Sequence, residues 1–197
     1  MNLPLPTPAM LLAFMLVGET LLMRSRMSGD GSRAADRGSL RLLMTVIGVS
    51  VGIAWIVGRR VPQARFAALF QMDATAVTAL YCVGLALFVA GLALRWYSIR
   101  YLGRLFTFDV AVAADHRVID TGPYRLVRHP AYTGSLLSFV GLGLCGGNAI
   151  SLALLLVPIA LAFMNRIVVE EAALTAGLGS AYADYMTRTR RLVPFVY

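Results

Sequence analysis

The chain contains no lysine and few charged residues of either sign. All 18 of its basic residues are arginines, and with 10 acidic residues they give a formal net charge of +8. Such a charge would suit a nucleic-acid-binding protein if the arginines formed one patch, but they lie in the gaps between apolar segments. We therefore interpret them as determinants of membrane topology and as candidate anion ligands, and we expect no nucleic-acid partner.

Cysteine is also scarce, which limits the chemistry available to the chain. The two cysteines, Cys82 and Cys145, both fall inside apolar segments. Two isolated thiols support neither a disulfide framework nor a metal site, so we predict no metal.

Hydrophobic residues, in contrast, make up 58% of the 197 residues, and the mean hydropathy is +0.72. These values place the chain with multi-pass integral membrane proteins, and its length leaves no room for a second sizeable domain. Residues 1–6 lack the positive charge of a signal peptide, and the apolar stretch that follows them is long for one. We expect that stretch to be a retained membrane span.

Five segments have the length of a membrane helix, and they predict an all-α polytopic fold. Residues 129–165 carry no Asp, Glu, Arg or Lys and are too long for one span, so Gly146-Gly147-Asn148 is predicted to divide them into a tight helical hairpin. We expect residues 1–73 to be a scaffold and residues 74–197 to carry the chemistry. The predicted spans are 3–23, 42–58, 74–97, 131–146 and 148–168.

The loops differ in their arginine content, and this predicts the orientation of the chain. Five arginines lie between the first two predicted spans, and three lie between the second and third. The more basic loop should be cytoplasmic, which places the 98–130 loop and the C-terminal tail in the cytoplasm as well. Because the chain is compact and uses only arginine as its basic residue, we expect the inner membrane of a prokaryote.

Two features of the first three predicted spans suggest contacts between helices. Gly48 and Gly52 form a GxxxG pair, and the third span contains Gly84 and Gly91, so close helix packing is expected there. Glu19 lies within the first span, where an acid is a functional candidate. Because Arg24 is near, Glu19 is better explained as an acid at the interface or between helices.

The 98–130 loop is too long and too patterned to be a plain connector. It holds short β-type stretches at 106–110 and 117–119, and Gly122-Pro123 predicts a turn before Tyr124. Pro130 directly follows His129 and suits the first turn of a helix, whose free N–H groups attract a carboxylate or phosphate. The alternative is that the basic residues next to this helix only anchor it among lipid headgroups.

Beyond the last predicted span, Arg166 and Glu170 lie four residues apart, on one face of a helix. They could form an ordinary helix pair. Arg166 is also the first charged residue after a long apolar span, at a depth where it could pair with the carboxylate of a lipid-soluble substrate. The tail at 169–189 is predicted to be a partly amphipathic helix with Tyr182 and Tyr185 at the membrane interface.

The order of these motifs resembles the isoprenylcysteine carboxyl methyltransferase family of integral membrane enzymes. The resemblance extends over roughly residues 75–197, whereas the first two spans match only in hydrophobicity. The matching motifs are His116-Arg-Val-Ile119, Thr121-Gly-x-Tyr124, Arg128-His-Pro-x-Tyr132, Arg166-x3-Glu170 with Glu171, the Gly179, Tyr182 and Tyr185 spacing, and Arg191-Leu-x-Pro194.

The resemblance implies that S-adenosyl-L-methionine is the cofactor and donates a methyl group to the C-terminal carboxylate of a prenylated cysteine. Arg166 would be the substrate-binding residue, and Arg166 and Glu170 would form the catalytic pair. Asp109 corresponds to a cofactor-contacting position of some relatives, although the residue type differs. The cofactor-binding residues implied by position are His116, Arg117, Val118, Ile119, Tyr124, His129, Pro130, Ala131, Tyr132 and Glu170.

This chemistry needs little help from the protein, because a carboxylate is already ionised at neutral pH and requires no general base. The main task would be to align the two reactants. Arg166 would orient the carboxylate, Glu170 would suit the cofactor's ammonium, and the helix start at Pro130 would suit the cofactor's carboxylate. We expect the lipophilic substrate to enter from the bilayer, among the membrane lipids.

Three alternatives stay open. The acceptor could be a phospholipid amine or a thiol, in which case His116, His129 or a water would have to take a proton. An NADPH-dependent sterol reductase shares an Arg-His-x-x-Tyr-x-Gly pattern, but Pro130 and Ser135 depart from what those reductases show. The third alternative is a membrane subunit without enzymatic activity. The identity of the acceptor is not determined by the motifs.

Overall fold

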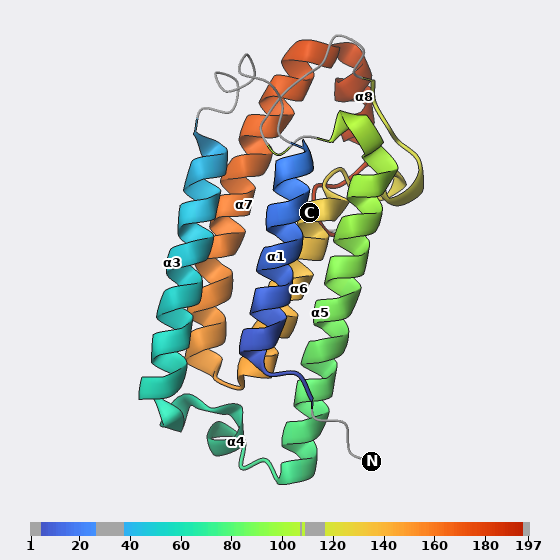
Figure 1. The fold of residues 1–197 in the computed structure, drawn as a ribbon. Helices are drawn as coiled ribbons and strands as arrows, with labels where there is room; N and C mark the ends of the chain where they lie inside the picture. Colours follow the sequence, from blue (N-terminus) through green and yellow to red (C-terminus); the bar gives the residue numbers. More distant parts are fainter. Residues whose placement is uncertain (1–4, 27–37, 107, 109–116, 195–197) are drawn as a thin grey trace.

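The structure is a computed structural model that describes residues 5–26, 38–106, 108 and 117–194. Within these residues the chain forms helices, and its β pairing consists of two isolated bridges, Arg65 with Asn148 and Val127 with Arg190. Figure 1 shows the long helices side by side along one axis. The α-helices are α1 (Pro8–Arg26), α3 (Ser39–Arg60), α4 (Phe66–Leu69), α5 (Ala74–Leu102), α6 (Pro130–Gly146), α7 (Ala149–Leu178) and α8 (Ser180–Arg188).

Four helical stretches of the described chain are long and apolar enough to cross a membrane. All five predicted spans contain a helix, but the fourth, α6, is an inner helix of 17 residues that packs against α5 and α7. The predicted all-α polytopic fold is confirmed, with four helices that meet the length of a span and a shorter buried one among them. The four stretches are Pro8–Ser25, Ser39–Arg60, Ala74–Leu105 and Ala149–Leu178.

Glycines allow α5 and α6 to approach closely. A Cβ atom at Gly91 of α5 would lie 2.5 Å from the Ser138 nitrogen of α6, and one at Gly84 would lie 2.9 Å from the Gly141 carbonyl oxygen. The opposing Gly134 has its own would-be Cβ 2.6 Å from the Arg95 nitrogen. Small residues on both helices therefore bring the two backbones into contact, as is usual between membrane helices.

The glycine pair of α3 does not lie at a helix contact, contrary to the prediction. Gly48 and Gly52 are exposed, and a Cβ atom at either would meet nothing within 4 Å. Helix α3 instead packs against α7 through another face, where the Ser151 hydroxyl donates a 2.8 Å hydrogen bond to the Ala54 carbonyl. The expected role of Gly48 and Gly52 in packing within the chain is therefore wrong.

The predicted hairpin between α6 and α7 is confirmed. Gly147 ends α6 in a left-handed conformation with φ of 70°, which favours glycine, and Asn148 caps α7 by accepting a 2.9 Å hydrogen bond from the Ser151 amide. The same Asn148 side chain donates to the Val61 carbonyl at the end of α3, 2.9 Å away. Local turn chemistry thus closes the hairpin and ties it to α3.

An ion pair between residues far apart in the sequence joins helix α1 to the bundle. Arg95 of α5 donates two hydrogen bonds of 2.6 Å to the two carboxylate oxygens of Glu19. Arg95 is buried, so this pair links α1 to α5 in a largely dehydrated place. The prediction that Glu19 is a helix-pairing acid is confirmed, but its partner is Arg95 instead of the nearby Arg24.

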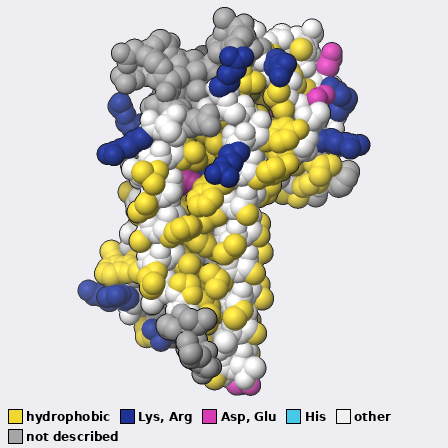
Figure 2. Space-filling model, turned by 45° about the vertical axis from the view of Figure 1, so that its right-hand side comes forward, with side chains coloured by type: hydrophobic (Ala, Val, Ile, Leu, Met, Phe, Trp, Pro, Cys, Tyr) yellow, Lys and Arg dark blue, Asp and Glu magenta, His cyan; other side chains and the backbone are white. Residues whose placement is uncertain are grey.

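The arrangement of the helices places the candidate site at one end of the bundle. The C-terminal ends of α1, α5 and α7 lie at the top of Figure 1, together with the N-terminal ends of α3 and α6. Figure 2 shows arginine side chains on this upper part and at the lower left, with hydrophobic surface between them. This distribution agrees with two membrane interfaces separated by an apolar zone, while the side that faces the cytoplasm stays a prediction.

Two boundaries differ from the predicted ones. Helix α7 continues to Leu178, so the predicted helix at 169–189 is divided: its first part belongs to α7, and α8 begins only after a break at Gly179, where φ is 59°. The stretch Arg117–Ile119 has no regular secondary structure, and the predicted β-type stretch at 106–110 falls largely outside the described residues.

Candidate active site

The site is organised around the first turn of α6 and the middle of α7. His129 precedes α6, and Pro130 is its first residue, as the sequence predicts. Pro130 and Ala131 are both buried, and the Ala131 carbonyl accepts a 3.4 Å hydrogen bond from Arg95. These two residues therefore fix the start of the helix and thereby the direction in which His129 and Tyr132 point.

A C-terminal strap, residues 189–192, runs beside this helix start. The amide of Arg128 donates to the Arg190 carbonyl at 2.7 Å, and the amide of His129 donates to the Arg191 carbonyl at 3.0 Å. The Thr133 hydroxyl donates to the Leu192 carbonyl at 2.7 Å. Two backbone donors that directly precede α6 are thus bound by the chain itself, so they are not available to an anion in this structure.

Glu171 lies at the centre of a charged cluster beneath the strap. The carboxylate accepts hydrogen bonds from Arg128 at 2.7 Å and from Arg191 at 3.0 Å, and the His129 Nε2 atom lies 3.3 Å away. Its side chain is only 7% exposed. A buried carboxylate between two guanidinium groups satisfies its charge within the protein, so Glu171 holds the strap, α6 and α7 together.

Glu170, the preceding residue, faces a different environment. The Tyr132 hydroxyl donates a 2.6 Å hydrogen bond to one carboxylate oxygen, and His129 Nδ1 lies 4.0 Å from the other. The rings of His129 and Tyr132 stack, with their centroids 5.5 Å apart. Because the Glu170 side chain is 29% exposed, its carboxylate is reachable and retains lone pairs for a further donor.

Arg166 lies one turn earlier on α7 and is almost fully buried at 2% exposure. It donates to the Ser39 hydroxyl at 2.6 Å, to the Tyr132 hydroxyl at 3.4 Å and to the backbone carbonyl of Phe108. Arg166 and Glu170 therefore meet at the same tyrosine hydroxyl, which accepts from Arg166 and donates to Glu170. The expectation that they share a helix face is confirmed.

Three tyrosines pack around this group from outside the long helices. Tyr124, Tyr182 and Tyr185 are buried, and the Tyr185 hydroxyl donates to the Tyr124 carbonyl at 2.7 Å. Burial raises the pKa of all three phenols, and the negative charge of Glu170 raises the pKa of Tyr124 and Tyr182 further. They stay neutral at physiological pH. Tyr182 and Tyr185 are buried in the protein, and their expected place at the level of the membrane interface stays a prediction.

Some of the predicted cofactor residues are not joined to this group. Within the described chain, Arg117 is exposed, and Val118 and Ile119 are half-buried; these three make no hydrogen bond or ion pair with the residues around Glu170. Tyr124 lies nearby, but its hydroxyl donates to the Ser98 carbonyl of α5 at 3.2 Å. His116 and Asp109 lie outside the described residues.

Two residues that contact the predicted site residues were not themselves predicted to belong to the site, Glu171 and Ser39. Glu171 follows Glu170 directly, and composition alone cannot show which of two adjacent acids is buried. Ser39 lies far from Arg166 in the chain, at the start of a different helix. The partial signal for Arg191 is its place among the closing motif residues, although its ion pair with Glu171 depends on the folded strap.

Comparison with known proteins places this group in a family. A family profile described as phospholipid methyltransferase matches residues 79–181, which include α6 and the part of α7 that carries Arg166 and Glu170. The chain belongs to this phospholipid methyltransferase family. The predicted isoprenylcysteine methyltransferase resemblance is supported by further relatives.

Two plant proteins illustrate that similarity. The chain is 34% identical over 115 residues to protein-S-isoprenylcysteine O-methyltransferase B of Arabidopsis thaliana, covering 57% of this chain and 58% of that protein. It is 31% identical over 116 residues to a probable protein-S-isoprenylcysteine O-methyltransferase of Oryza sativa subsp. indica, covering 58% and 61%. The chain thus spans about three fifths of the length of these relatives.

A solved structure has the same fold. The eukaryotic intramembrane Ras methyltransferase ICMT (isoprenylcysteine carboxyl methyltransferase) matches with a TM-score of 0.62 and 25% identity, over 78% of this chain and 52% of that one. This likeness and the four apolar helices show that the chain is an integral membrane protein. The expected prokaryotic origin is not supported, because the named relatives are eukaryotic.

Proposed function

We propose that this chain is an S-adenosylmethionine-dependent membrane methyltransferase that O-methylates the carboxylate of a lipophilic acceptor such as a prenylated C-terminal cysteine. The observation that carries the proposal is the meeting of Glu170, Tyr132 and Arg166, within the matched family segment and at one end of a membrane bundle. A reachable carboxylate and a guanidinium meet at one tyrosine hydroxyl, so groups that could bind a cationic methyl donor and an anionic acceptor lie next to each other.

The residues around Glu170 fit the cofactor's ammonium group. The Glu170 carboxylate is partly exposed and has one oxygen bound to Tyr132, so it can accept an ammonium in a charge-assisted hydrogen bond. The stacked rings of His129 and Tyr132 offer a flat aromatic wall beside it. When bound, S-adenosylmethionine supplies an electrophilic methyl group on a sulfonium.

The backbone donors before α6 fit the cofactor's carboxylate less well than the sequence predicts. The amides of Arg128 and His129 already donate to the C-terminal strap. The exposed Arg117 is a candidate cation for that carboxylate, since it has no ion pair among the described residues.

Arg166 would bind and orient the acceptor. Its guanidinium donates to oxygens of Ser39, Phe108 and Tyr132, and an acceptor carboxylate that reached it would form a charge-assisted hydrogen bond. The group is nearly buried, so the attacking oxygen would be held in a site with little water. Because a firm grip on the ground state does not accelerate the reaction, the main contribution of Arg166 would be alignment.

A second candidate is methylation of a phospholipid amine, which the description of the family favours. Such an acceptor must lose a proton. His129 is held between Glu171 at 3.3 Å and Glu170 at 4.0 Å, so a neutral imidazole there could accept that proton. Membership in a methyltransferase family favours methyl transfer, to either acceptor, over the reductase alternative.

The test uses the detergent-solubilised full chain and S-adenosylmethionine with a labelled methyl group. The acceptors are farnesylcysteine analogues with a free carboxylate, an amino-phospholipid and an alkyl thiol. We expect label in a base-labile ester of the farnesylcysteine analogues. Label in the phospholipid alone would establish the second candidate, and no labelled product with any acceptor would overturn methyl transfer.

A further inference from the structure

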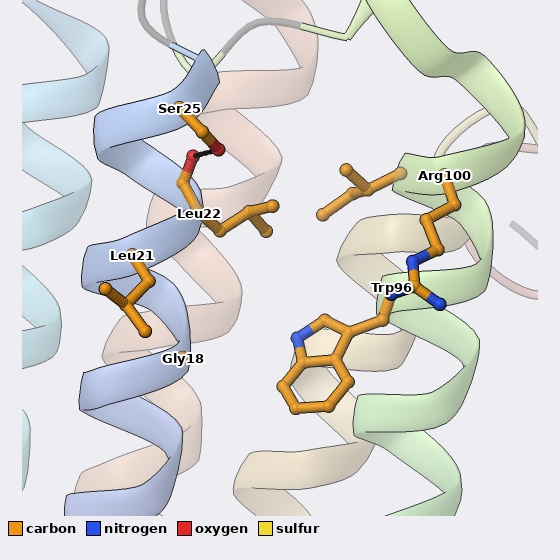
Figure 3. Close-up of a pocket in the computed structure, with 7 residues that line it drawn as sticks. Gly18, Leu21, Leu22, Ser25, Trp96 and Arg100 are labelled. Carbon is orange, nitrogen blue, oxygen red and sulfur yellow. Dashed lines mark hydrogen bonds between the residues drawn. The ribbon is translucent and has the colours of Figure 1, made fainter.

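Two long helices, α1 and α3, precede the matched family segment, and they meet the rest of the bundle differently. Helix α1 leaves a space of about 330 Å³ against α5, and Figure 3 shows Leu22 and Trp96 on its two sides. Helix α3 lies beside α7 in Figure 1, and its Leu43 is buried in the hydrophobic core. Of the two helices, α3 therefore gives the firmer support to the residues of α7.

At the end of the bundle that holds the candidate site, α3 contacts α7 through a hydrogen bond to Arg166. Ser39, the first residue of α3, accepts this 2.6 Å bond from Nη1 of Arg166, and both residues are buried. The preceding Gly38 has φ of 73°, a left-handed conformation that favours glycine, and its carbonyl accepts from the Leu42 amide at 3.0 Å. The turn into α3 thus fixes the place of the Ser39 backbone beside Arg166.

Two further hydrogen bonds hold α3 at the opposite end of α7. The Asn148 side chain donates to the Val61 carbonyl at 2.9 Å, and the Ser151 hydroxyl donates to the Ala54 carbonyl at 2.8 Å. Both of these bonds use backbone oxygens of α3, whereas the Ser39 bond uses a side chain and reaches a charged group. A substitution at Ser39 therefore changes the contact with Arg166 and leaves the other two bonds in place.

Ser39 is one of three groups that hold the Arg166 guanidinium in one orientation. Nε donates to the Tyr132 hydroxyl of α6 at 3.4 Å, and Nη2 donates to the Phe108 carbonyl. Each nitrogen is thus bound by a different part of the chain, so the planar guanidinium cannot turn without losing at least one of these bonds. Because the bond to Ser39 is much shorter than the bond to Tyr132, the start of α3 constrains the plane more strongly than α6 does.

We propose that Ser39 is a positioning residue that aims the Arg166 guanidinium at the acceptor's carboxylate. The proposal rests on the proposed function and extends the site to α3, a helix outside the matched family segment and within the part of the chain expected to be a scaffold. Ser39 acts through Arg166 and not on the reacting atoms. A guanidinium that is already aimed loses less rotamer freedom when the acceptor binds, so more of the bound carboxylates lie in line with the methyl donor.

The test compares Ser39→Ala with Ser151→Ala, which removes the same hydroxyl at the other end of the same helix pair. Steady-state rates with a farnesylcysteine analogue and the unfolding midpoint are measured for the detergent-solubilised full chain. We expect Ser39→Ala to lower kcat about tenfold, because misalignment slows the reaction, with KM for S-adenosylmethionine unchanged. Ser151→Ala should lower the unfolding midpoint about as much as Ser39→Ala does and keep the wild-type kcat.

A double variant shows whether Ser39 acts through Arg166. When Arg166→Lys has already removed the planar guanidinium, Ser39→Ala should cause no further loss of kcat, because two residues that act as one unit give non-additive effects. The rates of the two single variants and of the double variant complete this cycle.

The outcomes separate this proposal from the proposed function. A wild-type kcat in Ser39→Ala, equal losses of kcat in Ser39→Ala and Ser151→Ala, or an additive loss in the double variant would each overturn the positioning role and leave methyl transfer intact. A wild type that is inactive on every acceptor overturns both. Ser39→Cys replaces Ser39→Ala if that variant does not fold, since a thiol fills the site of the hydroxyl but is a weak acceptor.

Discussion

Arg166 combines the deepest burial of any charged side chain in the described chain with hydrogen bonds to Ser39, Tyr132 and the Phe108 carbonyl. Burying a guanidinium costs free energy unless its donors are satisfied, and here Ser39, Tyr132 and the Phe108 carbonyl satisfy them. Such an arrangement fixes the direction of the guanidinium plane before any ligand arrives. Its function at the residue scale would be geometric.

Arg166→Lys tests that geometric role. Lysine keeps the charge but lacks the planar fork, so it cannot reach three separate oxygens at once. We expect kcat to fall about a hundredfold, as misalignment of reacting groups commonly causes. Isothermal titration with S-adenosylhomocysteine should show an unchanged Kd; a parallel loss of binding would place Arg166 in the cofactor site instead.

Glu170→Gln tests the proposed ammonium ligand. The amide retains the shape and the contact with Tyr132 but loses the negative charge, and a hydrogen bond between charged groups contributes about 1.5–3 kcal/mol. We expect the Kd for S-adenosylhomocysteine to rise by a factor of about 10 to 150 in titration calorimetry. Asp184→Asn, an exposed acid on α8, is the matched control and should leave the Kd unchanged.

Glu171→Ala tests the role of the neighbouring acid in stability. The change leaves Arg128, Arg191 and His129 without their shared carboxylate, and breaking a buried ion pair commonly costs about 3–5 kcal/mol. The thermal unfolding midpoint in detergent should fall by many degrees.

The matched control for Glu171→Ala is Arg188→Ala, which breaks the exposed ion pair with Asp120. An exposed pair contributes at most about 1 kcal/mol, so this midpoint should barely move. Equal shifts in the two variants would contradict the central place of Glu171.

At the scale of the helices, the contact between α5 and α6 depends on the absence of side chains. Ser138 of α6 lies opposite Gly91, and its hydroxyl donates to the Phe88 carbonyl at 3.3 Å, across the interface. Two backbones this close gain many van der Waals contacts, but they tolerate no added atom between them.

Gly91→Ala tests this contact. The new methyl carbon would lie 2.5 Å from the Ser138 nitrogen and 2.6 Å from the Gly134 carbonyl oxygen, so the two helices must separate. We expect a loss of about 1–3 kcal/mol, the usual cost of overpacking, measured as a lower unfolding midpoint. Gly48→Ala, in open space on α3, should be neutral or slightly stabilising because alanine favours the helix. If both variants behave alike, the α5–α6 seam is not a tight contact.

The ends of the helices were predictable where neighbouring residues in the sequence determine them. Contacts that depend on a residue distant in the sequence were not predictable. Gly147 and Asn148 end one helix and start the next through their own backbone and side chain, so the hairpin follows from the sequence. The burial of Arg95 in α5 does not follow from the sequence. A charged residue suggests the edge of a span, and its burial is explained only by its ion pair with Glu19 of another helix. The outward face of Gly48 is equally a property of the assembled bundle.

The same division applies to the candidate site. Arg166, Glu170 and the helix start at Pro130 could be predicted, because a charge at the end of an apolar run and a proline at a helix start are local signals. The cluster around Glu171 could not, since its partners come from the loop before α6 and from the C-terminal strap, far apart in the chain.

On the scale of the whole molecule, the distribution of arginines predicts which end faces the cytoplasm. Arg59, Arg60 and Arg65 lie at the end opposite to the candidate site, and the more numerous arginines lie at the site's own end. S-adenosylmethionine, the proposed cofactor, is a polar metabolite of the cytoplasm, so the proposed function requires the same orientation.

Cysteine labelling in intact cells checks this orientation. Gln63→Cys and Arg188→Cys each place an exposed thiol outside the apolar helices, at opposite ends of the bundle. We expect a membrane-impermeant maleimide to label Gln63→Cys from outside and Arg188→Cys only after permeabilisation. The native Cys82 and Cys145 lie within apolar helices and give a low background. Labelling of Arg188→Cys in intact cells would invert the topology and contradict a cytoplasmic site.

The C-terminal strap also bears on the order in which the protein is made. The carbonyls of Arg190, Arg191 and Leu192 are needed to bind the donors around the start of α6, and Arg191 is needed for Glu171. A ribosome that has released α5, α6 and α7 into the membrane has therefore not yet produced a finished site. Until residue 192 emerges, Glu171 and the amides of Arg128 and His129 must bind water instead, so the helices can insert before the strap completes the site.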